Sequence, residues 1–97
     1  MTVQRISAFS DAGQGGNPAG IVLAEQLPAD AEMRRIAAEV GYSETAFAAP
    51  NGAPDQWRVR YFSPESEVPF CGHATIALGA ALAAHSGDGT YRLTLNP

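Results

Sequence analysis

The run GHATIALGAALAA, from Gly72 to Ala84, constrains the fold of this chain more than any other segment. Its length and its alanine and leucine content favour a helix, and Gly87 follows as a stop. Apolar side chains lie almost all round that helix. A helix with so little polar surface is a buried helix, so the rest of the chain has to cover it.

Short strands are available to supply that cover. The clearest is Gln56–Phe62, where Trp57, Val59 and Tyr61 alternate with Arg58 and Arg60, the pattern of a half-buried strand. Further strands are expected at Thr2–Phe9, Ala19–Glu25, Ser43–Pro50 and Tyr91–Leu95. Glycine- and proline-rich turns are expected at residues 11–20, 51–55 and 63–69.

A second helix precedes the buried one. Asp30 is a candidate N-cap, and Met33, Ile36, Ala37 and Val40 repeat at helical spacing before a glycine stop at residue 41. The expected order is therefore β-β-α-β-β-α-β. This order predicts an α+β domain over residues 1–97, with a bent, mostly antiparallel sheet wrapped around a buried central helix.

Composition excludes several classes of function. A chain of 97 residues with a net charge of −4 and no basic run lacks a nucleic-acid footprint. It contains no lysine, which excludes Schiff-base chemistry by this chain alone. The single cysteine cannot form an internal disulfide, and no signal or membrane-spanning run is evident. We expect a soluble cytoplasmic protein that binds neither nucleic acid nor membrane.

Three clusters carry the candidate chemistry: Gly15-Gly16-Asn17-Pro18, Ser43-Glu44-Thr45 and Cys71-Gly72-His73. At the start of a helix, Cys71 would lie beside free N–H groups that lower the pKa of a thiol and bind a carboxylate. The alternative is a small buried apolar residue, the usual place of a free cysteine. No spacing of cysteine, histidine and acid resembles a metal site, so none is expected.

The other two clusters are open to two interpretations as well. Glu44, between two hydroxyl residues at the start of a strand, is a candidate proton-transfer group or a solvated loop residue. The loop around Asn17 can offer an amide and bare N–H groups to an anion, or it is a plain turn. It matches neither phosphate-loop pattern.

The order of the motifs is more specific than any one of them. The segments GGNPAGIVL, MRRIAAEVGYSETAF and WRVRYFSPESEVPFCGHATIALGAAL resemble the N-terminal half of the PhzF-like (phenazine biosynthesis) isomerase family, from about residue 6 to residue 95. The resemblance implies the diaminopimelate epimerase fold. It also implies a cofactor-independent transfer of a proton between carbons of a small carboxylated metabolite, cyclic or derived from an amino acid.

The resemblance also implies roles for individual residues. Glu44 would be the proton-carrying base, His73 would line the active site, and Gly72 would help to bind the substrate carboxylate. Cys71 lies where related epimerases have a catalytic thiol, and Asn17 lies near the same cleft. We expect the neighbouring residues Gly16, Ser43 and Ala74 to contribute to substrate binding.

The family's active site lies between two similar halves, and the resemblance covers only one of them. Three interpretations are open: a fragment, a subunit completed by a complementary C-terminal-half chain, and a homodimer that imitates the complete fold. A protein that binds or sequesters a small metabolite without converting it is the alternative to an enzyme.

Overall fold

The computed structural model describes residues 3–8, 17–42, 44–87, 89 and 91–95, which form one mixed sheet and two helices. The elements are β1 (Gln4–Ala8), β2 (Asn17–Leu23), α1 (Asp30–Val40), β3 (Thr45–Asn51), β4 (Ala53–Phe62), β5 (Glu67–Val68), α2 (Gly72–Ser86) and β6 (Arg92–Thr94). Within these residues, neither helix is long and apolar enough to cross a membrane. The predicted α+β class is confirmed.

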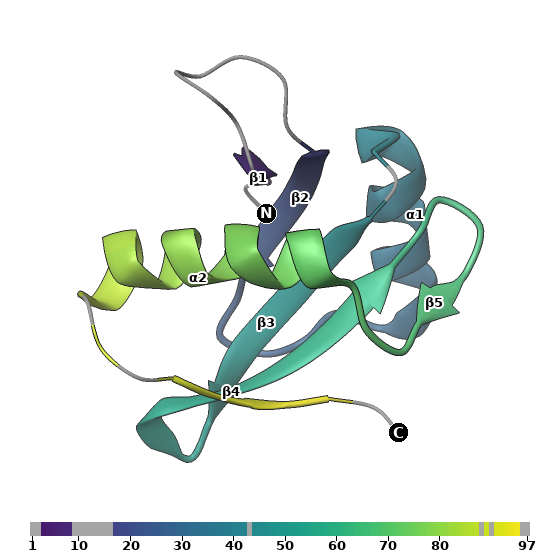
Figure 1. Ribbon diagram of the computed structural model, residues 1–97. Coiled ribbons are helices and arrows are strands. Elements are labelled where there is room, and N and C mark those ends of the chain that lie inside the picture. The colour runs from purple at the N-terminus through teal and green to yellow at the C-terminus, as the bar shows by residue number, and fades with distance from the viewer. Residues whose placement is uncertain (1–2, 9–16, 43, 88, 90, 96–97) are drawn as a thin grey trace.

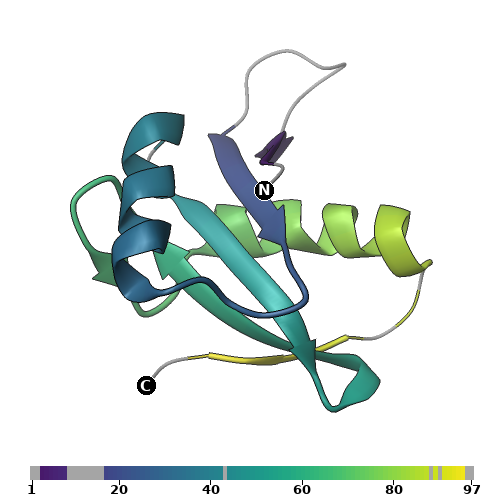
Figure 2. The same cartoon turned by 180° about the vertical axis from the view of Figure 1, so that it is seen from behind.

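The sheet has the order β1-β2-β3-β4-β5, and β6 joins the outer side of β4 next to β5. The β2–β3 and β4–β6 pairs are parallel and the others antiparallel. Helix α1 makes the crossover that the parallel β2–β3 pair requires. Two opposite views show α1 and α2 on opposite faces of the sheet (Figures 1 and 2).

Helix α2 packs on the sheet through one side only. Its buried residues are Ala74, Ala77, Leu78, Ala81 and Leu82. They contact Trp57, Val59 and Tyr61, the apolar side of β4 that the sequence predicts. On the opposite side of the helix Ile76 is 49% exposed, and Gly79 and Ala80 are exposed too. The sequence predicts a helix that is buried all round, but the described residues cover only one side of α2.

Helix α1 covers the other face of the sheet through the predicted stripe. Met33, Ile36 and Ala37 are buried against Phe47 and Phe62. Gly41 ends the helix in the left-handed conformation at φ 76°, which favours glycine. The N-cap prediction is wrong by one residue. Ala29 occupies that position without a side-chain hydrogen bond, and Asp30 is the first helical residue.

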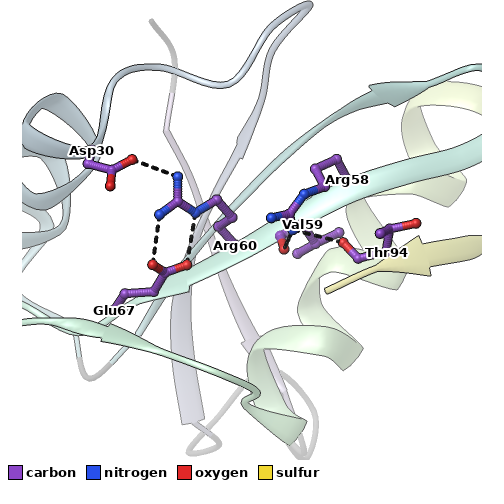
Figure 3. A network of polar contacts seen from close by, with 6 residues as sticks. All are labelled: Asp30, Arg58, Val59, Arg60, Glu67 and Thr94. Atoms are coloured by element: carbon purple, nitrogen blue, oxygen red, sulfur yellow. Dashed lines mark hydrogen bonds and ion pairs between the residues drawn. The ribbon is translucent and has the colours of Figure 1, made fainter. Parts of the chain in front are cut away.

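Arg60 on β4 binds the Asp30 carboxylate (Figure 3). Its guanidinium donates to Asp30 at 2.7 Å and to both carboxylate oxygens of Glu67 at 2.8 and 2.7 Å, and its side chain is only 16% exposed. The same group lies 5.4 Å from the centre of the Phe62 ring. One arginine on β4 thus connects the start of α1 with β5, a two-residue strand within a segment predicted as a turn.

The surroundings of Gly20 and Gly79 predict that the same substitution, glycine to alanine, has opposite effects on stability at the two positions. A Cβ at Gly20 would lie 2.9 Å from Thr45 Oγ1 and 3.1 Å from Val40 Cγ1, whereas a Cβ at Gly79 would meet nothing within 4 Å. We expect Gly20→Ala to lower the free energy of unfolding by about 1–3 kcal/mol through overpacking. Gly79→Ala should raise it by up to ~1 kcal/mol through helix propensity.

Urea unfolding of both variants checks this pair. Each is a glycine-to-alanine change, so Gly79→Ala controls for the loss of glycine flexibility in the unfolded chain. A Gly20→Ala variant as stable as the parent would show that Thr45 and Val40 move aside, and would contradict the tight packing.

Candidate active site

Two segments distant in sequence meet at one end of the sheet. Glu44 directly precedes β3, and its carbonyl accepts a hydrogen bond from the Gly20 N–H at 3.1 Å, which holds it against β2. Cys71 is the N-cap residue of α2. Because the N-terminal end of α2 points toward the start of β3, the Glu44 carboxylate and the Cys71 thiol face each other.

Glu44, Cys71 and His73 form a half-buried triad. The Cys71 thiol donates to Glu44 Oε1 at 3.1 Å, and His73 Nδ1 lies 3.4 Å from the sulfur. His73 Nε2 lies 3.4 Å from Glu44 Oε1, and the histidine and glutamate side chains are 18% and 19% exposed. The three residues expected to be catalytic therefore lie together, within reach of a small molecule from solvent.

The electrostatics of Cys71 differ from the expectation. The N–H groups of His73 and Ala74 do lower the pKa of the thiol, as a helix start should, although the side chain makes no capping hydrogen bond. Burial raises that pKa more strongly, and the carboxylate of Glu44 raises it further, so the net direction is upward. The thiol therefore keeps its proton at neutral pH and donates it to Glu44 in a hydrogen bond.

A hydrogen-bonded chain holds the start of α2 in place. The Cys71 carbonyl accepts from the Thr75 N–H at 3.0 Å and from its hydroxyl at 2.8 Å. The Tyr61 hydroxyl lies 2.7 Å from the Thr75 hydroxyl, and the tyrosine ring is buried. Sequence reasoning missed both supporting residues. The signal was the polar Thr75 inside an otherwise apolar run, one turn after Cys71.

The remaining predicted residues differ in what they can contribute. Gly72 is exposed, and a Cβ there would meet only the Phe70 ring at 4.0 Å, so the backbone is open to approach. The Ala74 side chain is fully buried in the core, which leaves only its backbone for substrate binding. Asn17 begins β2 at the same end of the sheet. Its side chain, and all of Gly16 and Ser43, lie outside the described residues.

A hollow of about 400 Å³ lies at the opposite end of α2, away from the triad. Its lining includes Gln4, Leu23, Ala24, Glu25, Pro50, Trp57 and His85. None of the three triad residues lines it. The triad therefore lies apart from this hollow, at the partly exposed start of α2.

The raised pKa of Cys71 gives a testable reactivity. We expect iodoacetamide to modify the folded chain slowly at neutral pH, with a pH midpoint above the ordinary thiol value of 9.0. Glu44→Gln should move that midpoint down, because it removes a negative charge next to the thiolate. Mass spectrometry gives a clean readout, since the chain has one cysteine.

The urea-unfolded chain is one control. Glu25→Gln, which removes an exposed carboxylate away from the triad, is the other.

The raised pKa of Cys71 also fixes the direction in which stability changes with pH. The protonated Cys71 thiol stabilises the fold fully at pH values below the pKa of the thiol in the unfolded chain. This stabilisation is lost as the pH rises through the pKa of the thiol in the folded chain. A folded midpoint below the unfolded one would mean that the helix N–H groups outweigh burial and Glu44.

Comparisons with known proteins agree with this fold. Residues 6–96 match the family model for phenazine biosynthesis-like proteins, PhzC-PhzF. The uncharacterized isomerase YddE of Escherichia coli is 45% identical over 75 residues, which are 77% of this chain and 25% of that protein.

Two solved structures are similar over 97% of this chain. The PhzF-family phenazine biosynthesis protein of Bacillus anthracis has a TM-score of 0.83 at 35% identity, and the predicted epimerase PA4716 of Pseudomonas aeruginosa has 0.88 at 26%. The chain spans only 32% and 34% of them. The resemblance found in the motifs is confirmed, and the chain belongs to the phenazine biosynthesis-like (PhzC-PhzF) protein family.

Proposed function

We propose that this chain forms the proton-transfer wall of a cofactor-independent isomerase or epimerase. Its substrate would be a small metabolite that carries a carboxylate, cyclic or derived from an amino acid. The observation that carries the proposal is the convergence of Glu44, Cys71 and His73 at the start of α2. Names of relatives such as YddE, an isomerase, support the same class of reaction.

The hydrogen bond between Cys71 and Glu44 indicates which of the two residues acts as the base. The Glu44 carboxylate accepts a hydrogen bond from the Cys71 thiol and lies beside His73, so it is the group placed to take a proton from carbon. A C–H bond breaks and an O–H bond forms on Glu44, while the electron pair stays delocalised in the substrate. Glu44 exchanges its proton with solvent between removal and return, and then gives a proton to another carbon on the same face, without net oxidation or reduction.

The substrate carboxylate would lie at the start of α2. Free N–H groups and the helix dipole favour an anion there, and Gly72 leaves the backbone accessible. This position holds the substrate a few ångströms from Glu44 and withdraws charge from the carbon that loses its proton. Efficient transfer also requires that water be excluded from the cleft.

A second half-domain of the same kind would supply that exclusion. Support comes from the exposed apolar surface beside the triad, where Phe70 is 56% exposed and Ile76 49%. The relatives are about three to four times longer than the part that this chain matches. The second half-domain would come from a complementary C-terminal-half chain or from a second copy, and light scattering of the pure chain tells the two apart.

Solvent exchange tests the function. The chain, alone and mixed with the C-terminal segment of the B. anthracis relative, is incubated with candidate carboxylates in deuterated buffer. Deuterium at a substrate carbon, detected by NMR, is the expected result. Ligand binding without label in either mixture would instead identify a metabolite-binding protein.

A further inference from the structure

Glu44, Cys71 and His73 bring three kinds of metal-ligand atom close together: a carboxylate oxygen, a sulfur and an imidazole nitrogen. Cys71 Sγ and Glu44 Oε1 are 3.1 Å apart, His73 Nε2 and Glu44 Oε1 are 3.4 Å apart, and Cys71 Sγ and His73 Nε2 are 3.9 Å apart. The set forms a compact triangle, with all ligand atoms within 4.8 Å of one another.

These separations are close to those of a tetrahedral metal site. Bond lengths of about 2.3 Å from Zn²⁺ to sulfur and 2.0–2.1 Å to nitrogen and oxygen place neighbouring ligand atoms roughly 3.3–3.6 Å apart. The oxygen–nitrogen edge of 3.4 Å lies within that range, the sulfur–oxygen edge of 3.1 Å lies about 0.2 Å below it, and the sulfur–nitrogen edge of 3.9 Å lies about 0.3 Å above it. We propose that Glu44, Cys71 and His73 bind a thiophilic divalent cation such as Zn²⁺, with the fourth ligand position toward solvent.

The donor set favours this class of ion over the common hard cations. Thiolate and imidazole suit Zn²⁺ and Co²⁺, whereas Mg²⁺ and Ca²⁺ prefer sites built of oxygen. On binding, the Cys71 S–H bond breaks, a sulfur–metal bond forms and the proton leaves to solvent, with no change of oxidation state. The thiolate and the Glu44 carboxylate then balance the two positive charges of the ion.

The backbone around the ligands is already fixed. The Thr75 side chain and N–H hold the Cys71 carbonyl, and Gly20 holds the Glu44 carbonyl. Ligands held in this way lose little conformational freedom on binding. Gly72 is exposed and has no Cβ, so we expect the fourth position to face solvent and to take a water molecule.

The sequence offers no reason to expect a metal site, and the positions of the three proposed ligands in the chain explain why. A Cys-Gly-His segment offers two ligands, fewer than a zinc site needs. The third, Glu44, lies 27 residues before Cys71, at a spacing typical of no zinc motif. Only the pairing of β2 with β3 and the direction of α2 bring the carboxylate to the other two.

Metal binding stands independently of the proposed function. Where the proposed function holds, a bound ion occupies the Glu44 oxygen that would take the proton, and so stops the reaction reversibly. Exchange activity that is restored by a chelator would report that consequence, but the site itself is tested by binding alone.

The test is titration of the reduced, metal-free chain with Zn²⁺ by calorimetry and with Co²⁺ by absorption. We expect one ion per chain, a sulfur-to-cobalt charge-transfer band, and no binding of Mg²⁺ at the same concentrations. Even the loss of residues that only hold metal ligands lowers affinity about 10–100-fold, so Cys71→Ser, His73→Asn and Glu44→Gln should each lower it at least about tenfold.

His85→Asn is the matched control, since His85 lies at the far end of the same helix and is exposed. Its affinity for Zn²⁺ should equal that of the parent. Unchanged Zn²⁺ affinity in Cys71→Ser would overturn the site, and so would a His85→Asn loss equal to that of His73→Asn. Zinc-edge X-ray absorption of the parent chain needs no variant: one sulfur neighbour is expected, and none would overturn the proposal.

Discussion

Replacing Glu44 by glutamine is expected to lower the rate of carbon–deuterium exchange by about 10²–10⁴, the usual contribution of a general acid–base group. Glutamine keeps the size of the side chain and loses only the ability to take a proton. The variant should still fold and should still bind the carboxylate substrate at the start of α2, because neither depends on the charge of residue 44. NMR of the substrate in deuterated buffer measures the rate, in the mixture that shows exchange with the parent chain.

Two further variants make the result specific. Glu44→Asp keeps the carboxylate but draws it back from Cys71 and His73, so an intermediate rate is expected. Glu25→Gln removes an exposed carboxylate from the hollow at the other end of α2 and should leave the rate unchanged. If Cys71→Ser abolished exchange while Glu44→Gln retained it, the thiol would be the base and the proposed division of labour would be wrong.

This result can be told apart from the metal site. A Glu44→Gln variant that loses exchange but still binds Zn²⁺ as tightly as the parent would support the base and contradict the carboxylate as a ligand. The reverse outcome would keep the ligand and remove the base. The two proposals rest on the same three residues, but the measurements that decide them do not depend on each other.

The sequence predicted those parts of the fold that depend on local periodicity. The alternation of Trp57, Val59 and Tyr61 fixes which side of β4 is buried, and the stripe from Met33 to Ala37 fixes the inner side of α1. Strand β5 was missed because two residues carry no periodicity; tertiary contact between Glu67 and Arg60 holds it instead.

The candidate site was predictable as a set of residues but not as a geometry. The motifs point to Glu44, Cys71 and His73, yet no spacing in the sequence gives a 3.1 Å contact across 27 residues. The pKa of Cys71 shows the same limit. The helix start, visible in the sequence, lowers that pKa, but burial and the carboxylate, which depend on tertiary structure, raise it more.

The apolar pattern of α2 also left open which side of the helix faces the sheet. Leu78 is fully buried against the sheet, whereas Ile76 is half exposed. We expect Leu78→Ala to lower the free energy of unfolding by about 2–5 kcal/mol, a large part of the 5–15 kcal/mol typical of a domain. Ile76→Ala should lower it by about 0.5 kcal/mol or less. Urea unfolding at low protein concentration measures both.

The comparison of these two variants also tests what covers the other side of α2. Both substitutions remove methyl groups from the same helix, so helix propensity nearly cancels between them. If Ile76→Ala lowers stability as much as Leu78→Ala, and the loss shrinks on dilution, then a second copy already covers Ile76 in the isolated chain. If the loss appears only after the C-terminal segment of a relative is added, that segment covers it. A small loss under every condition would mean that Ile76 stays in water, and the proposed second half-domain would not lie on this side of the helix.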